Sequence, residues 1–178
     1  MAIYKIISGG QAGADVAGIK VGLDLGLKTG GMMPKGFKTK FGNRPQYSKY
    51  GLVEHPTSDN YAVRTAWNVK NSDATVRFAY DFDSAGENAT YNSIVKYNKP
   101  YFDINLDDVI SGNNLYVIDI AKFFDENHVG ILNVAGNCGK NQEEAKVIYD
   151  LVRKHLRIYL KLYNEYAKPK DFIDVEDL

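Results

Sequence analysis

The sequence has few of the features typical of secreted, membrane-spanning or nucleic-acid-binding proteins. It contains one cysteine, Cys138, so no disulfide can form within the chain. No stretch of about 18 apolar residues is present, and this excludes an ordinary transmembrane helix. Lysine plus arginine and aspartate plus glutamate each number 22, so the formal net charge is zero. Without a cationic excess, we expect neither nucleic acid nor an anionic membrane as a partner.

Signals for export and for metal binding are also missing. The N-terminus has no charged segment followed by a long apolar run, so we expect no signal peptide and a cytoplasmic protein. The three histidines, His55, His128 and His155, are far apart in the sequence. No Cys/His spacing is typical of a zinc site, so we expect no metal and no cofactor.

Strand-like and helix-like segments alternate through the 178 residues. Strands are expected at 3–8, 28–33, 52–55, 74–79, from 100 onward and at 129–135. Helices are expected at 13–26, about 59–71, after the loop 80–88 to about 98, at 114–127 and at 141–166. The alternation predicts one α/β domain, residues 1–167, with a mostly parallel sheet, followed by an acidic tail at 168–178.

A glycine-rich loop joins the first strand to the first helix. Backbone N–H groups can approach a ligand closely where glycine lacks a Cβ, and the helix N-terminus favours an anion. We therefore predict a phosphate-binding loop, although its spacing matches neither a dinucleotide fold nor a P-loop; a tight strand-to-helix turn is the alternative. The candidate ligand-binding residues here are Ser8, Gly9, Gly10, Gln11, Gly13 and Asp15. Asp15 is also explained as an ordinary helix-start residue.

Three further glycine-bearing loops, 33–37, 80–88 and 136–141, follow strands and are expected at the same edge of the sheet. The first supplies Pro34, Lys35 and Gly36, with Lys35 as a phosphate-binding cation or as part of a solvated basic loop spanning 35–50. The last supplies Gly136 and Asn137 as ligand-binding candidates.

The second predicted helix places Arg64, Asn68 and Asn71 on one face, where they bind a ligand or face solvent. We expect Ser58 or Thr57 to cap this helix. The loop and helix start after 80 supply Ser84, Gly86, Glu87, Asn88 and Thr90. Glu87 is the one candidate general acid or base, with a plain helix-start glutamate as the alternative.

The last predicted helix has two apolar stripes. One contains Ile148, Leu156 and Tyr163, and the other contains Val147, Ile158 and Leu162. Because an outer helix needs one stripe for the core, the second predicts a homo-oligomer interface through the C-terminal helix; burial between other elements is the alternative.

Four motifs resemble a known family. They are Ile7–Asp15 (ISGGQAGAD), Gly30–Gly36 (GGMMPKG), Tyr61–Asp73 (YAVRTAWNVKNSD) and Leu132–Gly136 (LNVAG). Over residues 3 to about 150, the chain resembles the circularly permuted YpsA branch of the SLOG superfamily, also labelled a molybdenum carrier family. The resemblance implies a Rossmann-like three-layer sandwich that binds a nucleotide-derived small molecule. The family has Thr where this chain has Ala12, and the Pro-Gly-Gly-x-Gly-Thr loop of the related phosphoribohydrolases is absent.

Three functions follow from the resemblance. The first is binding of an ADP-ribose-like or other phosphorylated nucleoside for sensing or sequestration, which the missing catalytic loop favours. The second is a hydrolase of N-glycosidic or phosphoester bonds that uses Glu87 with Arg64 or Lys35. The third is a molybdenum-cofactor carrier.

Overall fold

The computed structural model describes residues 2–112 and 116–167. The acidic tail predicted at 168–178 lies outside the described residues. Within them, no helix is both long and apolar enough to cross a membrane.

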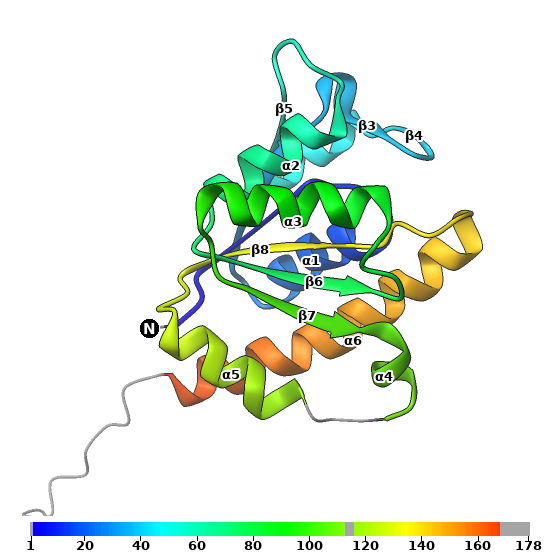
Figure 1. Cartoon of the computed structure of the whole chain (residues 1–178). Helices are drawn as coiled ribbons and strands as arrows, with labels where there is room; N and C mark the ends of the chain where they lie inside the picture. The colour runs from blue at the N-terminus through cyan, green and yellow to red at the C-terminus, as the bar shows by residue number, and fades with distance from the viewer. Residues whose placement is uncertain (1, 113–115, 168–178) are drawn as a thin grey trace, which may run out of the picture.

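The centre of the molecule is a six-stranded sheet in the order β5-β2-β1-β8-β6-β7, and every neighbouring pair is parallel (Figure 1). The strands are β1 (Lys5–Ser8), β2 (Lys28–Met33), β5 (Leu52–Glu54), β6 (Ala74–Ala79), β7 (Tyr101–Asn105) and β8 (Ile131–Gly136). This confirms the α/β class and the mostly parallel sheet. The last strand in sequence, β8, inserts between β1 and β6. The carboxyl ends of β1, β8 and β6 therefore lie next to one another in this order.

Helices cover both faces of the sheet. They are α1 (Ala14–Asp24), α2 (Tyr61–Lys70), α3 (Ala85–Tyr97), α4 (Leu106–Ile110), α5 (Tyr116–Glu126) and α6 (Gln142–Tyr166). The short α4 was not predicted, since its five residues are too few to show helical periodicity. The predicted caps of α2 are wrong: the side chain of Asn60, not that of Ser58 or Thr57, accepts a hydrogen bond from the N–H of Ala62.

The segment predicted as a long loop at 35–50 contains regular structure. Two short 3₁₀ helices, Lys35–Phe37 and Pro45–Tyr50, flank a hairpin of β3 (Lys38–Thr39) and β4 (Gly42–Asn43). The hairpin projects at the end of the molecule to which the strands point (Figure 1). Its strands have two residues each, too short for a period-2 pattern in the sequence.

The two faces of the sheet are packed differently. On one face, α1, α5 and α6 form the main apolar core with Val76, Phe78 and Val134 of the sheet. On the other face lie α2 and α3 (Figure 1), and none of their described residues belongs to either apolar core cluster. Polar side chains of the strands, including Thr75, Arg77 and Asn133, are buried instead. The site is built in this polar layer.

Candidate functional site

A cleft lies at the carboxyl ends of β1, β8 and β6. Open α/β sheets bind ligands at such a point, because the chain leaves neighbouring strands in opposite directions there. The cleft consists of two cavities of about 450 and 580 Å³, which we call the first and second cavity. They share a wall made by Gly86, Glu87, Gly136 and Cys138.

The first cavity has an ion pair in its wall. Arg64 of α2 donates from Nη1 to Oδ2 of Asp15 in α1, at 2.9 Å, and the Asp15 side chain is 3% exposed. Burial raises the pKa of Asp15, and the guanidinium of Arg64 opposes this shift. Gly9 makes the pair possible, since a Cβ at residue 9 would stand 1.4 Å from Nη1 of Arg64. The glycine therefore provides room for the arginine.

The glycine loop satisfies several of its own N–H groups. Gln11 N–H donates to Asp15 Oδ2 at 3.2 Å, and Ala12 N–H donates to the Gln11 side-chain oxygen at 3.1 Å. Ala14 N–H, at the start of α1, donates to the Asn137 carbonyl at 3.1 Å. These internal bonds occupy three of the N–H groups on which the phosphate prediction depends.

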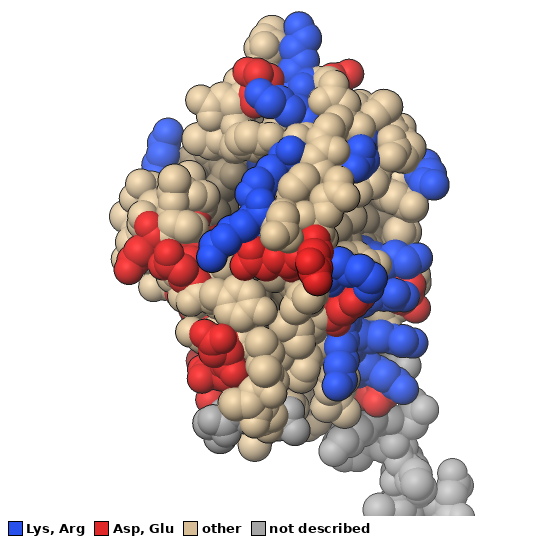
Figure 2. All heavy atoms as spheres, turned by 90° about the vertical axis from the view of Figure 1, so that its right-hand side faces the viewer, with Lys and Arg blue, Asp and Glu red and all other residues tan. Residues whose placement is uncertain are grey.

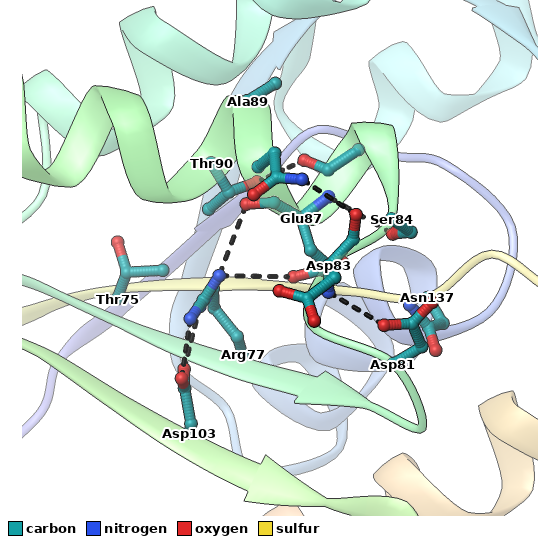
Figure 3. Close-up of polar contacts among 12 residues, drawn as sticks. Thr75, Arg77, Asp81, Asp83, Ser84, Glu87, Ala89, Thr90, Asp103 and Asn137 are labelled. Carbon is teal, nitrogen blue, oxygen red and sulfur yellow. Dashed lines mark hydrogen bonds and ion pairs between the residues drawn. The ribbon is translucent and has the colours of Figure 1, made fainter.

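A second ionic cluster joins Glu87 of the shared wall to Arg77 and Asp103, which line neither cavity (Figure 3). Arg77 of β6 forms a two-pronged bond with Asp103 of β7, from Nε at 2.7 Å and from Nη2 at 2.5 Å. Its Nη1 donates to the backbone carbonyl of Glu87 at 3.2 Å and lies 3.8 Å from Glu87 Oε2. Asp103 and Glu87 thus hold Arg77 between β7 and α3.

Glu87, in the shared wall of the two cavities, also has a raised pKa. Burial raises its pKa to about 7; Arg77 opposes the shift, while Asp15 and Asp103 add to it. Its Oε2 is buried and accepts no hydrogen bond from any described residue. A carboxyl group with this pKa can exist in either protonation state near neutrality, and can therefore donate or accept a hydrogen bond.

Asn68 has a structural contact that spacing alone could not show. Its side chain accepts from Met32 N–H at 2.8 Å and donates to Met32 C=O at 3.0 Å. The Asn68 side chain thereby hydrogen-bonds the β2 backbone at a position beyond the end of β1, where β1 no longer supplies a partner. Asn71 does not share the site: its Nδ2 donates to the carbonyl of Trp67 on the exposed side of α2.

The hairpin reaches over the cleft through Lys40. The backbone N–H of Lys40 donates to the Gln11 side chain at 2.8 Å, and its Nζ donates to the Gly139 carbonyl at 2.8 Å. Lys40 thus joins the loop after β1 to the loop after β8. It also lowers the pKa of Cys138, although burial has the larger effect and raises it. Cys138 is therefore not an activated nucleophile.

The structure brings most of the sequence-predicted residues together. Those that line the first cavity are Gly9, Gln11, Asp15, Arg64, Asn68, Gly86, Glu87, Thr90 and Gly136. Those that line the second are Ser84, Gly86, Glu87, Gly136 and Asn137. The predicted residues that line neither cavity are Ser8, Gly10, Gly13, Pro34, Lys35, Gly36 and Asn88.

Lys35 and Ala12 lie away from the first cavity. Lys35 is exposed, at the start of the segment that leads to the hairpin. Ala12 faces another cavity, beside Phe41 and Tyr149. The absence of a threonine hydroxyl at position 12 therefore does not change the lining of the first cavity.

Sequence reasoning did not select several residues of the site. Arg77 interrupts an otherwise uncharged strand, and that interruption was the available signal. Lys40 was grouped with a solvated loop, and its contact to Gly139 spans 99 positions of the chain. The other first-cavity residues outside the predicted ligand-binding set are Asn60, Tyr61, Ala62, Thr65, Ala85, Ala89, Asn133, Val134, Ala135 and Cys138.

Comparison with known proteins agrees with this fold. No curated protein matches the chain. A crystal structure at 1.45 Å resolution of a Syntrophus aciditrophicus SB protein, named "Putative molybdenum carrier protein", is 34% identical with a TM-score of 0.71, and the match covers 87% of this chain and 96% of that one. The family described as "Circularly permutated YpsA SLOG family" matches residues 6–160. The match covers the sheet and the whole cleft, and the chain therefore belongs to the circularly permuted YpsA SLOG family.

Proposed function

We propose that this chain binds a nucleotide-derived small molecule in the cleft and holds it, for sensing or sequestration. Family membership and the position of the cleft support a small-molecule-binding role. The finer part of the proposal is a phosphorylated nucleoside, with an ADP-ribose-like compound as one member of the class. A cavity of about 450 Å³ is within the range of small-molecule sites.

One observation carries the proposal. Nε of Arg64 and Oε2 of Glu87 are buried in residues that line the first cavity, and neither has a hydrogen-bond partner among the described residues. A buried donor or acceptor without a partner costs about 1–3 kcal/mol. A ligand that satisfies both atoms would recover that free energy. This combination favours a polar ligand that both accepts and donates.

Native mass spectrometry of protein purified from cells tests this proposal. We expect a retained small molecule that is released by denaturation and identified as a phosphorylated nucleoside. Titration with AMP and ADP-ribose, followed by thermal unfolding, should then raise the melting temperature, because a ligand at 100 times its Kd stabilises the folded state by about 2.7 kcal/mol. A ligand-free protein with no thermal shift would contradict the proposal.

A second candidate is hydrolysis of an N-glycosidic or phosphoester bond. The raised pKa of Glu87, about 7, favours it, since a general acid works best with a pKa near the operating pH. Chromatography of AMP or NAD incubated with the protein would detect a released base or phosphate. We expect Glu87→Gln to abolish any such turnover and to leave binding measurable. Retention of intact ligand by the wild type would support holding over cutting.

A third candidate takes up the name of the structural relative, a molybdenum carrier. The described residues contain no group of three or more His, Cys, Asp or Glu side chains that could hold a metal ion. The donor set therefore does not fit a bare metal ion, and an organic molybdenum cofactor would use the same cleft as a nucleotide. Elemental analysis and the absorbance spectrum of purified protein would separate the candidates.

We also propose that the chain self-associates through α6 in the cytoplasm. Val147, Ile158 and Leu162 lie on the outer stripe of this helix and are 41–48% exposed. Light scattering after size exclusion should give a mass above that of one chain, and Leu162→Glu should reduce it. Val95→Glu, at an exposed apolar residue of α3, is the matched control.

A further inference from the structure

The cations around the cleft differ in what they bind. Arg64 is paired with Asp15, and Arg77 is paired with Asp103. Arg77 is buried and Arg64 is largely buried, and their charges are compensated within the protein. They do not offer an excess positive charge to a ligand.

Lys40 differs from both arginines. Its Nζ donates to a neutral acceptor, the Gly139 carbonyl at 2.8 Å, and no carboxylate among the described residues forms an ion pair with it. It lines the first cavity and is exposed to solvent. Figure 2, which faces the end toward which the strands point, shows acidic and basic side chains side by side and no broad field of one sign. A local cation is therefore the source of attraction for an anion.

The backbone near the cleft offers few alternatives for an anionic group. Three N–H groups of the glycine loop are bonded within the protein, as described above. At the start of α3, Glu87 N–H donates to Ser84 Oγ at 3.4 Å. At the start of α6, Glu144 N–H donates to Asn141 Oδ1 at 2.9 Å. One N–H at the start of α3 and one at the start of α6 are thus capped by the protein itself.

The buried part of the first cavity has a different chemistry. It presents one N–H donor and one oxygen that have no hydrogen-bond partner among the described residues, Nε of Arg64 and Oε2 of Glu87, although Arg77 Nη1 lies 3.8 Å from that oxygen. The two acidic side chains that lie there, Asp15 and Glu87, face the guanidinium groups of Arg64 and Arg77, so this part of the cavity has no excess positive charge for an anion. An uncharged group that donates and accepts, such as a sugar hydroxyl or a base edge, would supply the hydrogen bond that each of these two atoms lacks.

We propose that Lys40 recognises the charged end of the ligand, and that Arg64 and Glu87 receive its uncharged polar end. In this orientation the phosphate lies at the mouth of the first cavity and the nucleoside lies inside. An anionic oxygen replaces the carbonyl of Gly139 as the acceptor of Lys40 Nζ. A charged hydrogen bond is stronger than the neutral-acceptor bond that it replaces. The proposal rests on the proposed function and names the residue that makes it specific for a phosphorylated ligand.

Calorimetric titration with AMP and with adenosine tests the proposal, using GMP and guanosine as a second pair. We expect Lys40→Ala to weaken AMP binding about tenfold and to change adenosine binding less than twofold. Lys40→Arg keeps the charge and should restore most of the affinity. Added salt should weaken AMP binding to the wild type more than to Lys40→Ala.

Lys35→Ala is the matched control, because Lys35 is an exposed lysine of the same segment and does not line either cavity. We expect no change in either affinity for this variant. An equal loss of AMP and adenosine binding in Lys40→Ala would overturn the inference and make Lys40 a structural contact only. Unchanged AMP binding would also overturn it. Failure of the wild type to bind any of the four probes would instead contradict the proposed function on which the inference rests.

Discussion

At the scale of single residues, the site depends on charges whose partners come from distant parts of the chain. Arg64 and Asp15 are 49 positions apart, and Arg77 and Asp103 are 26 apart. Removing one partner of such a buried pair leaves the other charge without compensation, at a cost of about 3–5 kcal/mol. The sequence supplied Asp15, Arg64 and Glu87 as candidates, since they lie near helix starts or on one helix face. It could not supply their pairing, because no local pattern encodes contacts across the sheet.

The first residue-scale prediction concerns Gly9. Gly9→Ala should displace Arg64 from Asp15, because the new Cβ would meet Nη1 at 1.4 Å. We expect a loss of about 1–3 kcal/mol in the free energy of unfolding, measured by denaturant titration. In the background of Arg64→Ala the same change should cost little, since the clashing side chain is gone.

Gly86→Ala is the control for this experiment. A Cβ at Gly86, also in the cavity wall, would meet nothing within 4 Å. Because alanine is a better helix former than glycine, this variant should be equally stable or more stable. Additive costs of Gly9→Ala and Arg64→Ala would show that the two residues do not act through one contact.

The second residue-scale prediction concerns Glu87 and pH. Its pKa is raised from 4.5 to about 7 in the folded protein, so the folded state binds more protons than the unfolded state between these values. Stability should therefore fall as the pH rises from 4.5 to 7, by up to about 3 kcal/mol from this group. Glu87→Gln should remove that part of the pH dependence. Denaturant titrations of both proteins at several pH values measure the difference.

Glu143→Gln, at an exposed glutamate of α6, is the matched control. If the stability difference between wild type and Glu87→Gln stays constant with pH, Glu87 does not titrate in this window. The predicted proton linkage would then be wrong.

At the scale of elements, the strands of the central sheet were easier to predict than the short hairpin and 3₁₀ helices that connect them. β6 was predicted with both of its ends correct, because its mostly apolar and β-branched run, interrupted only by Arg77, starts after Asp73 and ends at the loop 80–88. The hairpin of β3 and β4 was not predicted, although its Lys40 closes one side of the cleft. Its Lys40 also contacts Gln11 and Gly139, in the loops after β1 and β8, and a local pattern does not contain such distant contacts.

The element-scale prediction concerns the attachment of α2 to β2. Asn68→Ala should leave both the N–H and the C=O of Met32 without partners, at a cost of about 2–4 kcal/mol in the free energy of unfolding. Asn71→Ala, at the exposed end of the same helix, should cost less than about 0.5 kcal/mol. Denaturant titration compares the two variants. Similar small costs would show that Asn68 does not anchor the helix.

At the scale of the whole molecule, the alternation of strands and helices was enough to predict the class and the edge at which the cleft lies. Parallel strands must all end at one edge, so loops far apart in sequence had to meet there. The division of that edge into two cavities was not predictable, because it depends on which side of each loop the side chains occupy. Ala12 and Gln11, neighbours in the sequence, face different cavities for this reason.

The polar layer beneath α2 and α3 has a consequence for how the protein opens in solution. Because the buried residues of these helices are mostly polar and none belongs to either apolar cluster, local opening should release them before the sheet. Their amide hydrogens should exchange with deuterium faster than those of β1 and β8. A ligand bound in the first cavity would contact α2, α3 and the strand ends, so it should slow exchange in these two helices most. Equal protection of both layers in a deuterium-exchange experiment would show that the protein opens as one unit.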